Sequence, residues 1–274
     1  MKPFENGAPY PLWDEPPLWQ EGSEQPKPCL RPYLADQRRR GAVIVCAGGG
    51  YVFKSEFEAG PVAGFFASQG IHAFVLEYRL APQYRHPCQL MDAQRAVRTL
   101  RHLAKEGAIP VLEDHIAILG FSAGGHLAAL TGTEYAQPPL YPKDAIDWES
   151  ARPDAVLPCY ARLRLYEDRR EGQGCRYALT GLPYHEETAR ALSPDLRVQP
   201  DSPPFFLWHT MTDQSVPVED SISMALALHA KGIPCELHLF PQGRHGLGLA
   251  PDHEDLRQWS GLAASFLRLR GFQG

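Results

Sequence analysis

Residues 115–131 read HIAILGFSAGGHLAALT, and this stretch decides the fold class. An apolar run over 116–121 leads directly into Ser122, and a segment rich in Ala and Leu follows it. A short, continuous apolar run is typical of a strand that is buried on both faces, and the segment after it is predicted to be a helix. We therefore expect a strand, a sharp turn at Ser122 and then a helix.

The same alternation of strand and helix extends through most of the chain. Strands are predicted at 29–35, 42–47, 71–78, 115–121, 154–160, 204–210 and 236–241. Helices are predicted at 61–69, 90–105, 122–130, 218–231 and 253–269. Short apolar strands that alternate with amphipathic helices predict an α/β fold, in which helices cover both faces of a mostly parallel central sheet.

Two segments depart from this alternation. Residues 1–28 are rich in Pro and Trp and have no regular periodicity, so we expect an extended N-terminal arm packed over the surface. Residues from about 162 to 192 are polar and charged and include three glycines, which indicates an insertion or small cap after a strand. Since a single α/β domain commonly reaches this length, residues 29–274 are predicted to form one domain.

Charge and composition exclude several kinds of binding partner and of cellular location. A net charge of −5 argues against nucleic acid as a partner. No stretch approaches the ~18 apolar residues of a membrane span, and the N-terminus lacks a signal-peptide core, so we expect a cytoplasmic protein without a membrane partner. Six scattered cysteines predict free thiols, and 11 histidines without ligand spacing predict no metal. A homo-oligomer stays open.

A G-x-S-x-G motif, formed by Gly120, Ser122 and Gly124, occupies the predicted strand–helix junction. Such a turn holds its serine in a strained conformation and leaves no room for β-carbons at the flanking positions. The helix N-terminus also directs N–H groups at the reacting oxygen. The motif predicts Ser122 as a nucleophile, and a plain glycine-rich connection is the alternative.

A serine nucleophile requires donors for the oxyanion that forms during acyl transfer. A glycine triplet, Gly48, Gly49 and Gly50, follows the predicted strand at 42–47, where backbone N–H groups can approach a substrate carbonyl. We expect the triplet, with Gly49 as first choice, to act together with the N–H of Ala123. A phosphate-binding loop is disfavoured because no G-K-[ST] follows and no G-x-G-x-x-G opens a helix here.

The serine also requires an acid on a loop after a late strand. Asp213 follows the predicted strand at 204–210 and precedes the candidate histidine in the chain. Glu219 and Asp220 are rivals, but they fall in the first turn of the next predicted helix, where acids complement the helix dipole. Asp213 is the preferred acid.

The base is expected on the loop after the last strand. His245 lies there, between Gly243 and Gly246, which allow the loop to fold inward. His238 and His253 are weaker candidates, since one is predicted in mid-strand and the other inside the last helix. The order Ser122, Asp213, His245 is the order expected for a nucleophile elbow of this type.

Several motifs together resemble a known family: AGGGY (47–51), EYRLAPQYRHPCQLMDAQRAVRTLR (77–101), GFSAGGHLAA (120–129), the loop TDQSVPVEDS and GRHG. From about 42 to 266 the chain resembles bacterial α/β-hydrolases of the esterase/lipase superfamily. It is most similar to acetyl esterases and acetylxylan-esterase-like proteins, related to the hormone-sensitive-lipase branch. Related families have His at the position of Ala47, but the backbone donors of the glycines do not depend on that side chain.

The resemblance implies an α/β-hydrolase fold and a serine carboxylesterase that needs no cofactor. Its implied substrates are short acyl groups, acetyl above all, on sugars or small alcohols. Tyr51, Phe53 and Tyr78 are candidate walls of the pocket, with core packing as the alternative. Three other readings stay open, namely an arylformamidase-like amidase, a peptidase-like hydrolase, and a binding protein that keeps this fold without catalysis.

Overall fold

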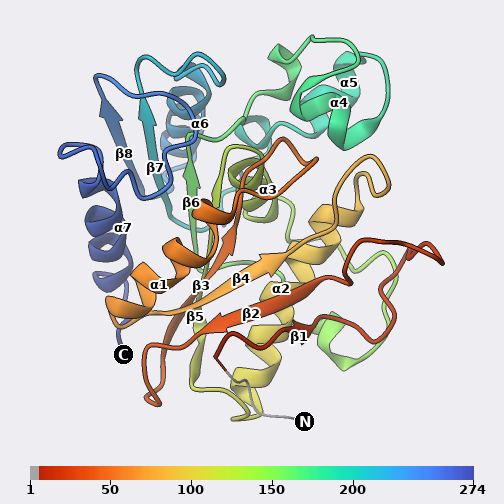
Figure 1. Cartoon of the computed structure of the whole chain (residues 1–274), viewed down its shortest axis with the longest axis vertical. Coiled ribbons are helices and arrows are strands. Elements are labelled where there is room, and N and C mark those ends of the chain that lie inside the picture. The colour runs from red at the N-terminus through yellow and green to blue at the C-terminus, as the bar shows by residue number, and fades with distance from the viewer. Residues whose placement is uncertain (1–5) are drawn as a thin grey trace.

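A computed structural model describes residues 6–274, and in this part of the chain eight strands form one sheet (Figure 1). The strands are β1 (Tyr10–Pro11), β2 (Cys29–Tyr33), β3 (Arg40–Cys46), β4 (His72–Glu77), β5 (Val111–Phe121), β6 (Ala155–Cys159), β7 (Phe205–Thr210) and β8 (Cys235–Phe240). Their order across the sheet is β1-β2-β4-β3-β5-β6-β7-β8. Pairing is antiparallel for β1 with β2 and for β2 with β4, and parallel for all other neighbours. The predicted mostly parallel sheet is confirmed.

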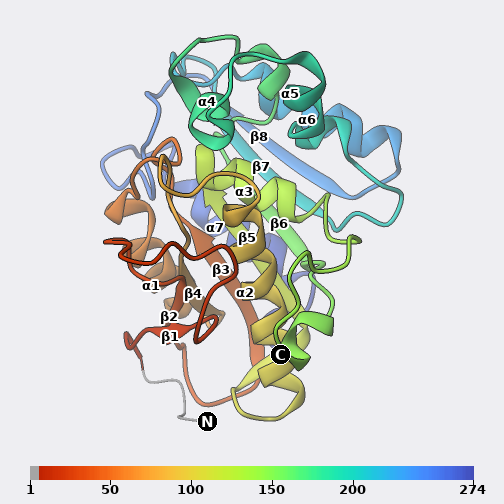
Figure 2. The ribbon, with the colours of Figure 1, turned by 90° about the vertical axis from the view of Figure 1, so that its right-hand side faces the viewer.

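Helices cover both faces of this sheet (Figures 1 and 2). The α-helices are α1 (Gly60–Ser68), α2 (Cys88–Lys105), α3 (Ala123–Thr131), α4 (Gly174–Thr180), α5 (Glu186–Ala191), α6 (Glu219–Ala230) and α7 (Gln258–Arg268). Short 3₁₀ turns are η1 (Glu56–Glu58), η2 (Ala145–Trp148), η3 (Leu165–Glu167) and η4 (Pro194–Leu196). One core cluster joins the sheet to α1 and α7, and the other joins it to α2, α3 and α6.

The alternation of side chains along β3 shows why the sheet needs both layers. Val43 and Val45 belong to the cluster with α1 and α7, whereas Ile44 and Cys46 belong to the cluster on the opposite face. Successive side chains of a strand point to opposite faces, so a strand that is apolar at every position must be covered on both sides. The continuous apolar runs of the sequence therefore become the inner strands of the sheet.

Every strand and helix predicted from the sequence is present, but the last helix begins later than predicted. It starts at Gln258, so the prediction that His253 lies inside this helix is wrong. The N–H of His253 donates to the carbonyl of Ala250 at 3.1 Å, three residues back, which is a turn and not an α-helical bond. Residues 251–252 and 254–257 form turns.

Residues 1–5 of the predicted N-terminal arm lie outside the described part of the chain. The described part of the arm packs through apolar side chains. Leu12 and Trp13 are buried in the core cluster that contains α2. Nε of Arg95, on α2, donates to the carbonyl of Leu12 at 2.9 Å. Strand β1 is a short addition that the sequence pattern did not reveal.

The predicted insertion at about 162–192 lies between β6 and β7 and contains η3, α4 and α5 (Figure 1). Its first part belongs to the core, because Leu163 and Leu165 are fully buried. Figure 1 shows α4 and α5 at the end of the molecule toward which the parallel strands point. In α/β sheets, ligands bind at this carboxyl end of the strands.

Other expectations concerned cysteines, membranes and metals. All six cysteines are free, and all are buried except Cys235, which is half-buried. Within residues 6–274, no helix combines the length and apolar character needed to cross a membrane. The same residues contain no group of three or more His, Cys, Asp or Glu side chains arranged to hold a metal ion.

Candidate active site

Ser122 occupies a strained turn between β5 and α3. Its backbone has φ 52° and ψ −114°, a conformation that a residue with a β-carbon rarely adopts. Its N–H donates to the carbonyl of Cys159 at 3.0 Å, and its carbonyl accepts from the N–H of His126 at 2.9 Å. These two bonds hold the turn between the end of β6 and the first turn of α3.

The two glycines of the motif are required by close backbone approach. A β-carbon on Gly120 would lie 2.1 Å from the carbonyl oxygen of Gly124. A β-carbon on Gly124 would lie 2.2 Å from the carbonyl oxygen of Cys46, at the end of β3. The strand and the helix can therefore meet at this angle only without side chains at these two positions.

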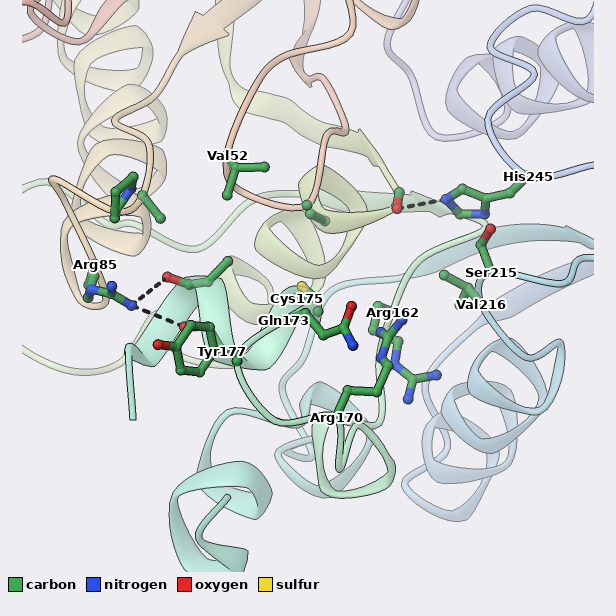
Figure 3. Close-up of a pocket in the computed structure, with 18 residues that line it drawn as sticks. Val52, Arg85, Arg162, Arg170, Gln173, Cys175, Tyr177, Ser215, Val216 and His245 are labelled. Carbon is green, nitrogen blue, oxygen red and sulfur yellow. Dashed lines mark hydrogen bonds between the residues drawn. The ribbon is translucent and has the colours of Figure 1, made fainter. Parts of the chain in front are cut away.

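Ser122, His245 and Asp213 form a continuous chain of hydrogen bonds, part of which Figure 3 draws. Nε2 of His245 lies 2.8 Å from Oγ of Ser122. Nδ1 of His245 lies 2.7 Å from Oδ2 of Asp213. Since a carboxylate can only accept, Nδ1 carries the proton and Nε2 is free to accept the serine proton.

Asp213 is held by more than His245. Its Oδ1 accepts from the N–H groups of Ser215 and Val216, at 2.8 and 3.0 Å. Nε2 of the fully buried His209 lies 3.3 Å from its Oδ2. Burial alone would raise the pKa of Asp213, but the hydrogen bonds from His209, His245 and Val216 outweigh it and hold that pKa well below its usual range. The acid therefore stays ionised.

The glycine loop after β3 is shaped by backbone bonds that depend on positive φ angles. Gly49 has φ 129° and Gly50 has φ 62°. The N–H of Gly48 donates to Oε2 of Glu58 at 2.9 Å, so the prediction of Gly48 as a candidate oxyanion donor is wrong, because a carboxylate already holds that N–H. The N–H groups of Gly49 and Gly50 have no hydrogen-bond partner within residues 6–274. Ala123 is the first residue of α3, a position whose N–H has no partner inside the helix.

Glu58 connects two loops of the site. Its Oε1 accepts from the hydroxyl of Tyr160 at 2.6 Å, and that hydroxyl accepts in turn from the N–H of Gly248 at 2.9 Å. The ring of Tyr160 packs edge-on against the ring of His245, with centroids 5.1 Å apart. Burial raises the pKa of Glu58, although the bonds from Tyr160 and Gly48 oppose the rise.

The three predicted wall residues do not line the pocket beside Ser122. Tyr51 is fully buried and its hydroxyl lies 2.7 Å from Nδ1 of His126. Tyr78 is also buried, and its hydroxyl donates to the carbonyl of Ala47 at 2.6 Å. Both tyrosines are buried in the core beside the glycine loop, as the core-packing alternative expected. Phe53 is exposed to solvent.

A pocket of about 520 Å³ opens beside Ser122 and His245 (Figure 3). The glycine loop contributes Val52, the loop after β7 contributes Val216, and the insertion contributes residues around Tyr177. This volume lies within the usual range of small-molecule sites, about 300–1,000 Å³. The insertion thus forms one wall of the pocket.

The rival acids and bases have other partners. Asp220 lies in the first turn of α6, as predicted, and is buried in an ion pair with Arg164 at 3.0 Å. His238 lies within β8, and its Nε2 is 3.4 Å from Glu236. Glu219 opens α6. None of these side chains joins the hydrogen-bonded chain of Ser122.

Sequence reasoning missed three residues that support the site, namely Glu58, Tyr160 and His209. His209 carried a weak signal, because it is a polar residue near the end of a buried strand, four positions before Asp213. Glu58 and Tyr160 carried none. They are separated by 102 positions, and only the folded chain brings them together.

Comparison with known proteins places this geometry in a family. The family model described as BD-FAE matches residues 32–228, which is more than half of the chain. The chain belongs to the BD-FAE family. The predicted membership among α/β-hydrolases of the esterase type is thereby confirmed.

Individual curated proteins match this chain over long stretches. The chain is similar to endo-1,4-beta-xylanase B of Butyrivibrio fibrisolvens, with 33% identity over 91% of this chain and 39% of the relative. It is similar to esterase LipC of Mycobacterium tuberculosis, with 32% identity over 69% of this chain and 48% of the relative. The chain thus spans less than half the length of these curated relatives.

A solved structure covers the whole fold. The acetyl ester-xyloside bifunctional hydrolase from Caldicellulosiruptor lactoaceticus has a TM-score of 0.90 and 39% identity, over 98% of each chain. The esterase and acetyl ester hydrolase names support the predicted carboxylic ester hydrolase, and the structural match extends over the whole fold.

Proposed function

We propose that this protein is a serine carboxylesterase that hydrolyses short-chain acyl esters, acetyl esters above all, of sugars or small alcohols. The observation that carries the proposal is the hydrogen-bonded chain from Ser122 through His245 to Asp213 at the mouth of a pocket. The names of the relatives support ester cleavage, and the acetyl ester hydrolase of similar structure supports the acyl group.

The first half of the reaction acylates the enzyme. His245 takes the proton of Ser122 at Nε2 while Oγ attacks the ester carbonyl carbon. The oxyanion accepts hydrogen bonds from the N–H of Ala123 and from the glycine loop, where Gly49 and Gly50 have unoccupied N–H groups. When the tetrahedral intermediate collapses, its C–O bond breaks and His245 gives the proton to the leaving alcohol.

The second half releases the acid. Water loses a proton to His245 and attacks the acyl carbon, and the second tetrahedral intermediate expels Oγ of Ser122, which regains its proton from the imidazolium. Asp213 stays ionised throughout, because its pKa lies far below neutrality, and it steadies the imidazolium. Neither half requires a cofactor.

Amide cleavage is the second candidate for this geometry, since the same triad can attack an amide. An ester is favoured because the relatives are named as esterases or as an acetyl ester hydrolase. A peptidase-like role has less support, since the insertion contains only one 3₁₀ turn and two short α-helices. A binding protein without catalysis has the least support, because His245 is hydrogen-bonded to both Ser122 and Asp213.

The test measures hydrolysis of p-nitrophenyl esters of increasing chain length, of acetylated sugars, and of the matching acyl p-nitroanilides, which are the amide analogues. We expect acetate to be the best acyl group and Ser122→Ala and His245→Ala each to lower kcat by about 10⁴-fold or more. A Ser260→Ala variant, altered at a serine on α7, is the matched control. Equal rates for wild type and Ser122→Ala would rule out the mechanism, and preference for octanoate would rule out the short acyl group.

A further inference from the structure

The pocket beside Ser122 has an excess of positive charge in its lining. Of the 18 residues that line it, Arg85, Arg162 and Arg170 have cationic side chains, and none is an aspartate or a glutamate. The whole chain has a net charge of −5, so this positive charge is local. A concave site lined by one sign of charge attracts ligands of the opposite sign.

Arg162 is the arginine whose donors are least occupied. It is 6% exposed, and its side chain makes no hydrogen bond within the described part of the chain. Its nearest carboxylate is Asp220, 3.5 Å from Nη1. Asp220 already accepts from the N–H groups of Leu163 and Arg164 and from Nε of Arg164. The guanidinium of Arg162 therefore lies buried with unused N–H donors.

The position of Arg162 is set by the sheet. It follows the end of β6, the strand beside β5, and its backbone N–H lies 3.4 Å from the carbonyl oxygen of Ser122. Ser122 and Arg162 both line the same pocket.

The other two arginines differ in what they can offer. Figure 3 draws Arg170 and Gln173 beside Arg162, on the side of the pocket away from Val52. Arg170 has an ion pair with Asp168 at 2.7 Å, but half of its side chain is exposed. Arg85 lies near Tyr177, and its Nη1 is already occupied, since it donates to the carbonyls of residues 177 and 178.

We propose that the alcohol part of the substrate carries a carboxylate, as an acetylated uronic acid does, and that Arg162 binds this carboxylate with help from Arg170. A buried guanidinium that has, among residues 6–274, one ion pair at 3.5 Å and no hydrogen-bond partner is costly, and a carboxylate matches its planar fork with two parallel hydrogen bonds. The proposal rests on the proposed function for the acetyl group. Because an acetyl group fills only a small part of 520 Å³, the carboxylate belongs to the alcohol.

The first test compares three acetyl esters that differ at one carbon: acetylated methyl glucuronoside, its methyl ester, and the matching acetylated methyl glucoside. We expect wild-type kcat/KM to be about tenfold or more higher for the charged ester than for the two neutral ones. Arg162→Gln should bring the ratio of these values close to one, and Arg162→Lys should keep part of it. Arg190→Gln, at an exposed arginine on α5 outside the pocket, should leave the ratio unchanged.

The second test measures binding without turnover. In a Ser122→Ala background, calorimetry with methyl glucuronoside and methyl glucoside should show tighter binding of the charged sugar. Adding Arg162→Gln should remove that difference, and circular dichroism and thermal melts of the double variant check that it folds.

The outcomes separate the two proposals. Acetyl esters cleaved with no preference for the charged sugar, or a preference that survives Arg162→Gln, would overturn the carboxylate site and leave the esterase intact. Binding of methyl glucuronoside that depends on Arg162, in a protein that cleaves no acetyl ester, would support the site and overturn the esterase.

Discussion

The backbone N–H of Gly48 donates a 2.9 Å hydrogen bond to the carboxylate of Glu58, a residue that is only 3% exposed. The other oxygen of that carboxylate accepts from Tyr160, whose hydroxyl also accepts from Gly248. One carboxylate thus links the glycine loop, which follows β3, to the loop that carries His245. Neither loop has a regular secondary structure that would hold it by itself.

Replacing Glu58 by Leu should loosen both loops at once. We expect kcat for p-nitrophenyl acetate to fall about 10²-fold with little change in KM, because small misplacements of reacting groups cost this much. Glu58→Gln should lose less, since its amide oxygen can still accept from Gly48. Steady-state kinetics measure the effect, with Glu56→Gln, at an exposed neighbour, as control. An unchanged kcat in Glu58→Leu would show that the link has no role in positioning.

Gly49→Ala should damage the glycine loop, which is the proposed source of oxyanion donors. A β-carbon at Gly49 would lie 2.2 Å from the carbonyl oxygen of Phe53, and φ 129° is unfavourable for alanine, so the loop must shift. Loss of one oxyanion donor lowers kcat by about 10²–10³-fold. The matched control is Gly64→Ala in α1, where a β-carbon meets nothing within 4 Å. This control should raise stability by about 0.5–1 kcal/mol and keep full activity. Equal kcat in both variants would contradict the role of Gly49.

Asp213→Asn should separate catalysis from stability. We expect kcat to fall by about 10⁴-fold, because an amide no longer fixes the tautomer of His245. The folded-state pKa of Asp213 is depressed, so its carboxylate stabilises the fold above the unfolded pKa of about 3.9 and loses that contribution as pH falls toward the folded pKa. Urea denaturation measures the difference in unfolding free energy between wild type and variant. We expect this difference to be constant from pH 7 to 5 and smaller at pH 3. A difference that grows on acidification would contradict the assignment.

His126 should make stability fall between neutral and mildly acidic pH. Burial lowers its pKa to about 4 from an ordinary 6.5, so the unfolded chain binds more protons than the folded chain between these values, and stability rises with pH across this window. Going from pH 7.5 to 5 should cost wild type about 2 kcal/mol more than His126→Gln. Urea denaturation of both proteins at the two pH values gives this difference. His72 and His86, whose pKa values are also lowered by burial, remain in both proteins and cancel. Equal losses in the two proteins would count against a buried neutral imidazole at this position.

Local patterns accounted for the sheet, its helices and the chain of Ser122, His245 and Asp213. The apolar runs specify strands buried on both faces, and the G-x-S-x-G motif marks a turn where strand and helix backbones come very close. Ser122, Asp213 and His245 each follow a predicted strand, and since the carboxyl ends of parallel strands meet at one edge of the sheet, their meeting could be expected. Cytoplasmic location and oligomeric state stay predictions.

Contacts between distant segments could not be read in the same way. Tyr51 and Tyr78 were predicted as pocket walls from their places in the sequence, yet their hydroxyls bond to His126 and Ala47 beneath the glycine loop. An aromatic side chain beside a loop can point either into the pocket or into the core, and only the packing of α3 against β3 decides that these two point into the core. The pocket wall comes instead from the insertion, whose path over the strands follows no periodicity.

The sequence by itself therefore determined the α/β architecture and the order of the proposed triad residues Ser122, Asp213 and His245, because strand and helix periodicities and a strained glycine-flanked turn are local properties. The tertiary structure alone decided which glycine N–H groups are free, since Glu58 reaches Gly48 only in the folded chain. It also decided the charge of the pocket. Arg162 is left without a hydrogen-bond partner there because Asp220 is taken by its neighbour Arg164, a competition in space that no spacing in the sequence records.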